Sequence, residues 1–258
     1  MVALYAYPFG ASIVRSFLDS EGSWTLANYA KVQDLYLRDV VFTLLVSILS
    51  TALAALLAIS LSAYLRFSTG PAARVASLVY RFPIFIPFVV VAQMMRTFLA
   101  PHGLLNIALA QVGLVNLEAP LHLLDWKGLT FGFVWKQAAF MTLIISSGFQ
   151  VVDDPYIEAA RSVGAKLHQV ILRILVPMSR ATIAVAIILA FTSTVGTFTL
   201  PFMLIGGQVP TTITVDIAHR VTYFGDWGVA NALGTVSYVL VLFAALYYLR
   251  YNLKQGVY

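Results

Sequence analysis

The uncharged run of residues 40–65, VVFTLLVSILSTALAALLAISLSAYL, constrains the fold of this chain most strongly. A helix of this length is longer than the roughly 30 Å hydrocarbon core of a bilayer. Its small residues at positions 47, 50, 54, 55, 58 and 62 predict close contact with a neighbouring helix. The whole chain is 60% apolar and only 10% charged, which excludes an ordinary soluble domain. We therefore expect an all-α, polytopic membrane protein.

Further apolar runs predict about six spanning helices in a single transmembrane domain, residues 1–258. Four of these spans are expected at about 75–99, 129–149, 179–200 and 229–249. The stretch 1–18 would extend only about 25 Å as a helix, so we expect the outer part of a first span whose beginning is truncated or whose start codon is misassigned. A surface-lying anchor is the alternative. Residues 19–37 are expected to form a polar loop, residues 100–128 a re-entrant or interfacial segment, and residues 211–224 a short amphipathic helix or a gate segment.

The polar stretch 153–177, DDPYIEAARSVGAKLHQVILRILVP, predicts two short helices joined at Gly164. Asp154 is suited to cap the first helix and Pro155 to occupy its first position, while Gly164 allows a left-handed turn and Pro177 ends the second helix. The result would be a compact pair of helices with a small surface at Ala159 and Ala160. Such a pair at a membrane face would fit the groove of a partner protein.

The distribution of basic residues predicts which side of the membrane carries this stretch. The loops on its side contain Arg66, Arg74, Arg161, Lys166, Arg173, Arg180, Arg250 and Lys254, and those on the other side contain Lys31, Arg38, Lys127 and Arg220. We therefore place residues 153–177 in the cytoplasm.

The same stretch resembles the EAA coupling loop of permease subunits in binding-protein-dependent ABC importers. Glu158, Ala159 and Ala160 are followed after three residues by Gly164, and after nine more by Ile174 and the pair Val176-Pro177. Two departures are Val176, where the family pattern has leucine, and Ser162-Val163, where the family often has an acidic residue. The resemblance implies the type I ABC importer permease fold, in the cytoplasmic membrane of a bacterium or archaeon. It assigns coupling to the ATPase to Asp154, Glu158, Ala159, Ala160, Gly164 and Pro177.

This family works as an assembly, so the resemblance also implies partners. They are a pair of ATPase subunits that bind ATP and Mg²⁺, a second permease subunit, and an extracytoplasmic solute-binding protein. A different second permease is favoured over a second copy of this chain. The permease itself is expected to be no enzyme and to bind no cofactor, and membrane lipid is its surrounding partner.

The solute is less constrained than the machinery. Residues 135–140 and 202–216 look most like the spermidine/putrescine branch of the family, which also includes importers of phosphonate, thiamine and ferric ion. Basic residues inside the spans argue against a polycation, which leaves a small anion as an alternative. A non-transport membrane protein is a more remote alternative.

Polar residues within the predicted spans are candidates for the translocation path, because charge in a span usually faces a cavity or partner. They are Arg96, Lys136, Gln137, Thr194, Gly196, Thr197, Thr199 and Pro201. Alternatively, the long basic side chains extend to the interface, and Gly196 and Pro201 mark a packed helix kink.

Several kinds of chemistry lack their sequence signals. The chain has no cysteine, no phosphate-binding Gly-x4-Gly-Lys loop and no nucleophile elbow, and its four histidines lie far apart. Its basic residues are scattered rather than clustered. We therefore expect no catalytic residues, no metal site and no nucleic-acid partner.

Overall fold

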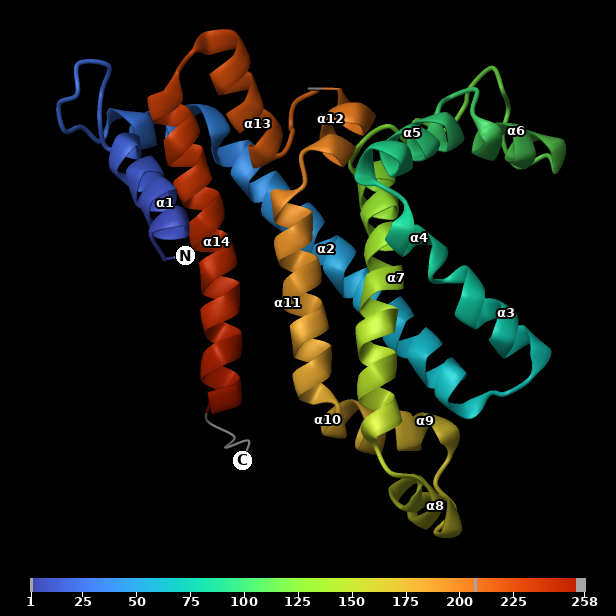
Figure 1. Ribbon diagram of the computed structural model, residues 1–258. Coiled ribbons are helices and arrows are strands. Elements are labelled where there is room, and N and C mark those ends of the chain that lie inside the picture. Colours follow the sequence, from blue (N-terminus) through green and yellow to red (C-terminus); the bar gives the residue numbers. More distant parts are fainter. Residues whose placement is uncertain (1, 207, 254–258) are drawn as a thin grey trace.

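The computed structural model describes residues 2–206 and 208–253, with side chains described from 6 to 206 and from 208 to 246. Helices dominate the described chain (Figure 1). In order, they are α1 (Val2–Ser16), α2 (Ala27–Phe67), α3 (Pro71–Val79), α4 (Phe82–Phe85), α5 (Phe88–Leu99), α6 (Leu104–Gln111), α7 (Trp126–Val151), α8 (Asp154–Ser162), α9 (Leu167–Val170), α10 (Val176–Met178), α11 (Arg180–Gly196), α12 (Thr199–Ile205), α13 (Ile213–His219) and α14 (Trp227–Leu253). Two π-helical turns, Ile171–Leu175 and Arg220–Phe224, extend α9 and α13.

Four helical segments among the described residues are long and apolar enough to cross a membrane: Ala27–Phe67, Phe88–Gln111, Trp126–Val151 and Trp227–Leu246. A fifth span is obtained if Leu167–Met178 and Arg180–Gly196, which meet at a bend of 77°, are counted together. Figure 1 shows α2, α7, α11 and α14 running between two ends of the bundle. We call the end that carries α8 the coupling end.

The centre of the bundle is the contact between α2 and α7, and it confirms the predicted role of the small residues. Ala54 and Ala58 of α2 are fully buried in one cluster with Met141, Ile145 and Phe149 of α7. Ser62 donates to the carbonyl of Thr142 (3.3 Å) and accepts from the Ser146 hydroxyl (3.0 Å). Small side chains therefore let the two backbones approach, and α11 packs on the same cluster through Ala186 and Ala190.

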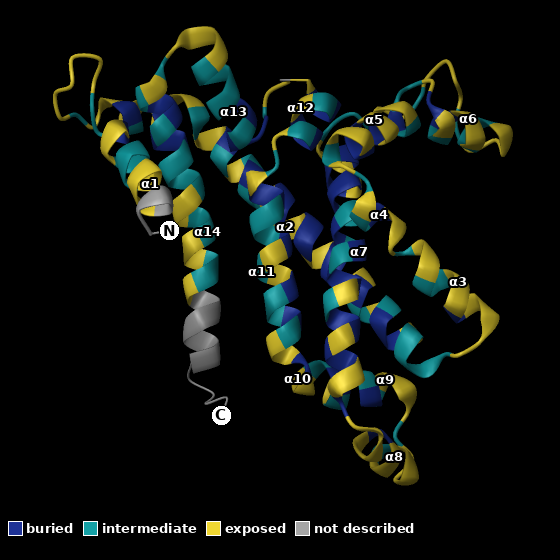
Figure 2. Cartoon of the chain, viewed as in Figure 1, coloured by how far each residue is buried: buried dark blue, intermediate teal, exposed yellow. Residues whose placement is uncertain are grey.

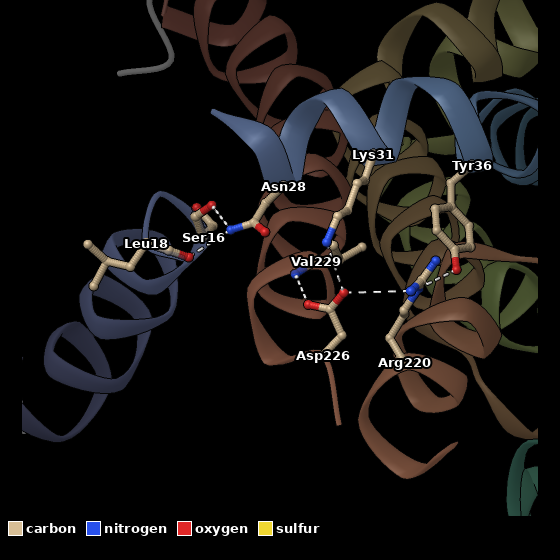
Figure 3. A network of polar contacts seen from close by, with 8 residues as sticks. All are labelled: Ser16, Leu18, Asn28, Lys31, Tyr36, Arg220, Asp226 and Val229. Carbon is tan, nitrogen blue, oxygen red and sulfur yellow. Dashed lines mark hydrogen bonds and ion pairs between the residues drawn. The ribbon is translucent and has the colours of Figure 1, made fainter. Parts of the chain in front are cut away.

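The prediction of a polar loop at residues 19–37 is wrong in its second half, because α2 begins at Ala27. Figure 3 shows hydrogen bonds that stabilise the first turns of α2. The Asn28 amide donates to the carbonyls of Ser16 (3.0 Å) and Leu18 (2.9 Å). Lys31 pairs with Asp226 at the start of α14 (3.6 Å). Tertiary polar contacts thus extend the helix well beyond its apolar run.

Within the stretch 1–18, residues Val2–Ser16 form the helix α1, which lies beside α14 (Figure 1). The Ser12 hydroxyl donates to the Asn231 side chain (2.7 Å), and the rings of Phe9 and Tyr238 lie 4.3 Å apart. A helix is therefore confirmed here, and it packs against the last span.

The expected span at 75–99 is not continuous. It consists of α3, α4 and α5, and the chain leaves the helical conformation between Phe85 and Phe88. Pro83 and Pro87 explain the interruption, since neither can donate a helical hydrogen bond.

Candidate functional site

Residues 153–177, which we call the coupling stretch after the loop that they resemble, form the pair of short helices that the sequence predicts. α8 ends at Ser162, and Gly164 follows with a φ of +83°, a left-handed conformation that favours glycine. Ile157 of α8 is buried, as are Val170 and Leu175 beyond the turn, in the same cluster as Phe149 of α7. The pair is therefore attached to the ends of the spanning helices by an apolar contact.

Arg66, near the end of α2, holds the beginning of α8. Its guanidinium donates to the carbonyls of Phe149 and Val152 (both 3.2 Å) and to the Asp154 carboxylate. The prediction that Asp154 caps α8 is wrong: Asp153 occupies the capping position without a side-chain hydrogen bond, and Asp154 lies inside the first turn. The carboxylate of Asp154 instead joins α8 to α2.

The outer face of the pair is unprotected in this chain. Figure 2 shows α8 almost entirely exposed. Glu158 and Ala159 lie on this face, whereas Ala160 is half-buried against the core cluster. Val163 is 84% exposed at the turn, which places a large apolar side chain where a partner would contact it.

Pro177 lies in α10, just before the 77° bend that leads into α11. At the bend, the Ser179 hydroxyl donates to the carbonyl of Gly148 in α7 (3.1 Å). A Cβ on Gly148 would come within 2.9 Å of Thr182, so glycine permits the close approach of α7 and α11. The coupling stretch is thereby joined to α7 and α11, which carry the candidates Lys136, Gln137, Thr194 and Gly196.

Two of these candidates, Gln137 of α7 and Thr194 of α11, lie together. The Gln137 amide donates to the Thr194 hydroxyl and to the carbonyl of Ala190, both at 3.4 Å. Thr194 also donates to that carbonyl (2.8 Å). Both side chains are buried, so this polar pair joins the two helices inside the bundle.

The other candidates on this part of the chain surround a helix break. α11 ends at Gly196, Thr197 is extended, and α12 begins at Thr199, with Pro201 buried inside it. The Thr197 carbonyl accepts a hydrogen bond from the Thr214 hydroxyl of α13 (3.0 Å). The predicted break is confirmed, and α13 supplies one of the hydrogen bonds that its backbone needs.

Arg96 and Lys136 lie apart from that pair and make contacts that the sequence did not indicate. Arg96 of α5 donates to the carbonyl of Met203 in α12 (3.1 Å). Lys136 points to the interrupted segment at α4, where its ammonium meets backbone carbonyls. Neither side chain reaches the Gln137 pair, so the predicted path residues do not form one cluster.

The sequence did not indicate one further set of polar contacts, which lies around α13. Asp39 of α2 accepts a hydrogen bond from the backbone of Thr211 (3.0 Å), and Asp216 of α13 is buried near it. Arg220 pairs with Asp226 (3.6 Å) and donates to the Tyr36 hydroxyl (Figure 3). The sequence shows acidic residues beside apolar runs. This pattern alone does not indicate that Asp39 and Asp216 lie near each other in the fold.

A cavity of about 480 Å³ lies among α5, α6 and α7. It is smaller than the apolar cavity of about 1150 Å³ among α2, α11 and α14. The lining of the smaller cavity consists of Gln93, Met94, Met95, Thr97, Phe98, Leu104, Phe131 and Trp135. The lining contains aromatic rings, an amide and a hydroxyl, and no carboxylate.

Comparison with known proteins identifies the family. Residues 50–257 match the family described as binding-protein-dependent transport system inner membrane component. Similar curated proteins include the xylose/arabinose import permease XacH of Haloferax volcanii, 28% identical over 69% of this chain and 58% of its own length. The trehalose/maltose permease MalF of Thermococcus litoralis is 30% identical over 58% of this chain and 52% of its own length. The chain thus spans just over half of these relatives.

The spermidine/putrescine permease PotB of Escherichia coli is 24% identical over 87% of this chain and 82% of its own length. Among solved structures, a bacterial alginate ABC transporter in complex with a pentasaccharide-bound periplasmic protein has a TM-score of 0.78 at 19% identity, covering 96% of this chain and 88% of that chain. The methionine ABC transporter MetNI has a TM-score of 0.63 at 18% identity, covering 85% of this chain and 95% of that chain. These structures confirm the type I ABC importer permease fold.

The matched family extends over most of the chain and includes the coupling stretch, the Gln137–Thr194 pair and the break at Thr197. This chain belongs to the family of inner membrane components of binding-protein-dependent transport systems.

Proposed function

We propose that this chain forms half of the translocation path of an ATP-driven importer and receives the force of a cytoplasmic ATPase through residues 153–177. The observation that carries the proposal is the contrast between the two faces of α8. Its inner face is attached by Ile157 and Arg66, while Glu158, Ala159 and Val163 are exposed. A protein that pulled on the outer face would therefore move the ends of α2, α7 and α11 together.

Co-purification with the ATPase subunit tests this coupling. We expect Glu158→Lys and Gly164→Pro to lose the ATPase, the first by reversing a charge at the contact and the second because proline cannot adopt the φ of +83°. Glu118→Lys, an equal charge reversal in an exposed loop at the opposite end, is the matched control. Retention of the ATPase by both coupling variants would contradict the proposal.

The Gln137–Thr194 pair and the break at Thr197 are proposed to line the path. They lie on α7 and α11, the two helices joined to the coupling stretch at Ser179 and Gly148. A movement of α8 would thus be transmitted to the polar pair. Gly196, Thr199 and Pro201 would take part by allowing the chain to change direction there.

For the solute, we propose a small polar molecule, and the relatives name two classes. A polyamine is supported by the permeases that match over most of this chain. A carbohydrate is supported by the sugar permeases and by the cavity at Trp135, because aromatic rings with amide and hydroxyl groups suit a sugar, whereas a polycation would need carboxylates.

The solute-binding protein of the same system separates these classes. Its thermal unfolding would be measured with spermidine, putrescine, xylose, maltose, a phosphonate, thiamine and ferric ion, since only a bound ligand raises the midpoint. A shift by a sugar alone would exclude the polyamine, and a shift by spermidine alone would exclude the carbohydrate.

The assembly would also contain a second permease, and we propose a different chain rather than a second copy.

A further inference from the structure

The interruption between α4 and α5 leaves backbone carbonyls without their helical donors. In an α-helix, the N–H of residue i donates to the carbonyl of residue i−4. Position 87 is proline, so the carbonyl of Pro83 has no such donor. The chain then turns to an extended conformation at Ile86 (ψ 122°), which also frees the carbonyls of Ile84 and Ile86.

Unpaired carbonyls are costly beside a helix that crosses a membrane. Lys136 lies about 15 Å from the first residue of α7, a 26-residue helix that is long and apolar enough to span a bilayer. Water does not reach such groups in lipid, so protein donors must satisfy them. The segment at α4 therefore depends on a donor from a neighbouring helix.

The Lys136 ammonium is this donor. Its Nζ donates to the carbonyls of Pro83, Ile84 (3.2 Å) and Ile86 (2.6 Å). An ammonium group has three N–H donors, so donors and acceptors match in number. The ring of Phe88 lies 5.2 Å from Nζ and presents its negative face to the charge.

The contact is not an ion pair. Within the described side chains, the ion pairs are Lys31–Asp226, Arg66–Asp154 and Arg220–Asp226, and none includes Lys136. Carbonyl dipoles and an aromatic ring thus stabilise this charge. The same groups coordinate free cations and ammonium ligands in other proteins.

We propose that the carbonyls of Pro83, Ile84 and Ile86, together with the Phe88 ring, form a binding site for a primary ammonium group. Lys136 fills this site from α7 and is a positioning residue that fixes α4 against that helix. The site selects an ammonium for its three N–H donors and not for its charge alone. This inference does not depend on the solute or on the coupling to an ATPase.

Paired spin labels test the site, because the chain contains no cysteine of its own. Labels at Phe85→Cys of α4 and Leu143→Cys of α7 use two exposed positions and report the distance between the helices in the purified chain. We expect one narrow distance distribution with Lys136 in place. In Lys136→Met, the population outside the main peak should rise on the order of tenfold, since hydrogen bonds of a charged group are lost.

Lys136→Ala allows a rescue experiment that a purely structural effect would not explain. Propylammonium supplies the atoms that this substitution removes, so its presence throughout purification should restore the narrow distribution. Tetramethylammonium, which has the same charge and no N–H donor, should not. Lys127→Met is the matched control on α7, because the Lys127 ammonium lies over the Trp126 ring instead, 5.9 Å from its centre.

Three outcomes would overturn the proposal. One is a Lys136→Met distribution as narrow as that of Lys127→Met. Another is equal rescue of Lys136→Ala by propylammonium and tetramethylammonium. The last is a Lys136→Ala chain that stays broad or unfolded in propylammonium.

Discussion

At the scale of single residues, Asp216 carries a carboxyl group in a place that disfavours its charge. The side chain is only 4% exposed, and its Oδ2 has no hydrogen-bond partner among the described residues. Burial, and secondarily the nearby Asp39, raise the pKa of Asp216 to about 8 against an opposing effect of Arg220. Asp216 is therefore protonated at neutral pH.

This shift predicts how stability depends on pH. An unfolded aspartate titrates near pH 4. Between about pH 4 and about pH 8 the folded chain keeps a proton that the unfolded chain has lost, so the free energy of unfolding falls as the pH rises through this window. Asp216→Asn removes the dependence. We expect the midpoint of Asp216→Asn minus that of the original chain to increase from about pH 6 to about pH 8 and then to level off.

Thr214→Val is a suitable control for that measurement. It removes the hydrogen bond to the Thr197 carbonyl on the same helix without changing a carboxyl group. Its midpoint should therefore fall by a similar amount at both pH values. A difference between Asp216→Asn and the original chain that does not change with pH would show that Asp216 is ionised throughout.

The Gln137–Thr194 pair makes a second prediction at this scale. Gln137→Leu keeps the side chain's size but leaves the Thr194 hydroxyl with only its own helix as partner. The substitution removes polarity without disturbing the α2–α7 contact. We therefore expect uptake of the solute that the thermal-unfolding screen identifies to fall on the order of tenfold, with little change in the midpoint of unfolding. Thr130→Val, which changes a buried hydroxyl on the first turns of the same helix, should leave uptake unchanged.

At the scale of elements, Arg66 determines whether α8 is attached to the bundle. It supplies hydrogen bonds to the carbonyls of Phe149 and Val152, which the end of α7 leaves unpaired, and it reaches Asp154 as well. Arg66→Gln should weaken this attachment by about 2 kcal/mol, a typical value for hydrogen bonds to a charged group.

Trypsin measures that change directly, because Arg161 lies exposed in α8. Cleavage after Arg161 requires local opening, so a loss of about 2 kcal/mol should increase its rate about thirtyfold in Arg66→Gln. Arg74→Gln, on the exposed face of α3 near the same end, is the comparison. Equal rates in the two variants would mean that Arg66 does not hold α8.

Some element boundaries that a proline or glycine sets were predicted from the sequence, although the interruption at Pro83 and Pro87 was not. Gly164 and the break after Gly196 are examples, because each reflects a backbone requirement that one residue reveals. The first turns of α2 were not predictable. Their helical state depends on Asn28 and Lys31 contacting residues far away in the chain, and no local pattern contains that information.

At the scale of the whole molecule, the sequence predicted membrane-spanning helices and a distinctive pair of short helices at one end of the bundle. It did not predict which polar side chains contact one another. The apolar runs predicted spans because hydrocarbon excludes unpaired backbone groups. The candidate path residues divided into the Gln137 pair and two separate contacts of Arg96 and Lys136, because helix rotation and the interruption at α4 decide where each side chain points.

The unequal distribution of basic residues between the two ends of the bundle predicts its orientation in the membrane. The cysteine-free chain allows a test of this prediction. Val163 lies at the coupling end and is 84% exposed, while Leu114 lies near α6 at the opposite end and is 72% exposed (Figure 1). The excess of arginine and lysine at the coupling end predicts that this end faces the cytoplasm. A membrane-impermeant maleimide should therefore label Leu114→Cys in right-side-out vesicles and Val163→Cys only in inside-out vesicles. The reverse pattern would place α8 where no cytoplasmic ATPase can contact it, and the proposed coupling would then be wrong even though the fold is unchanged.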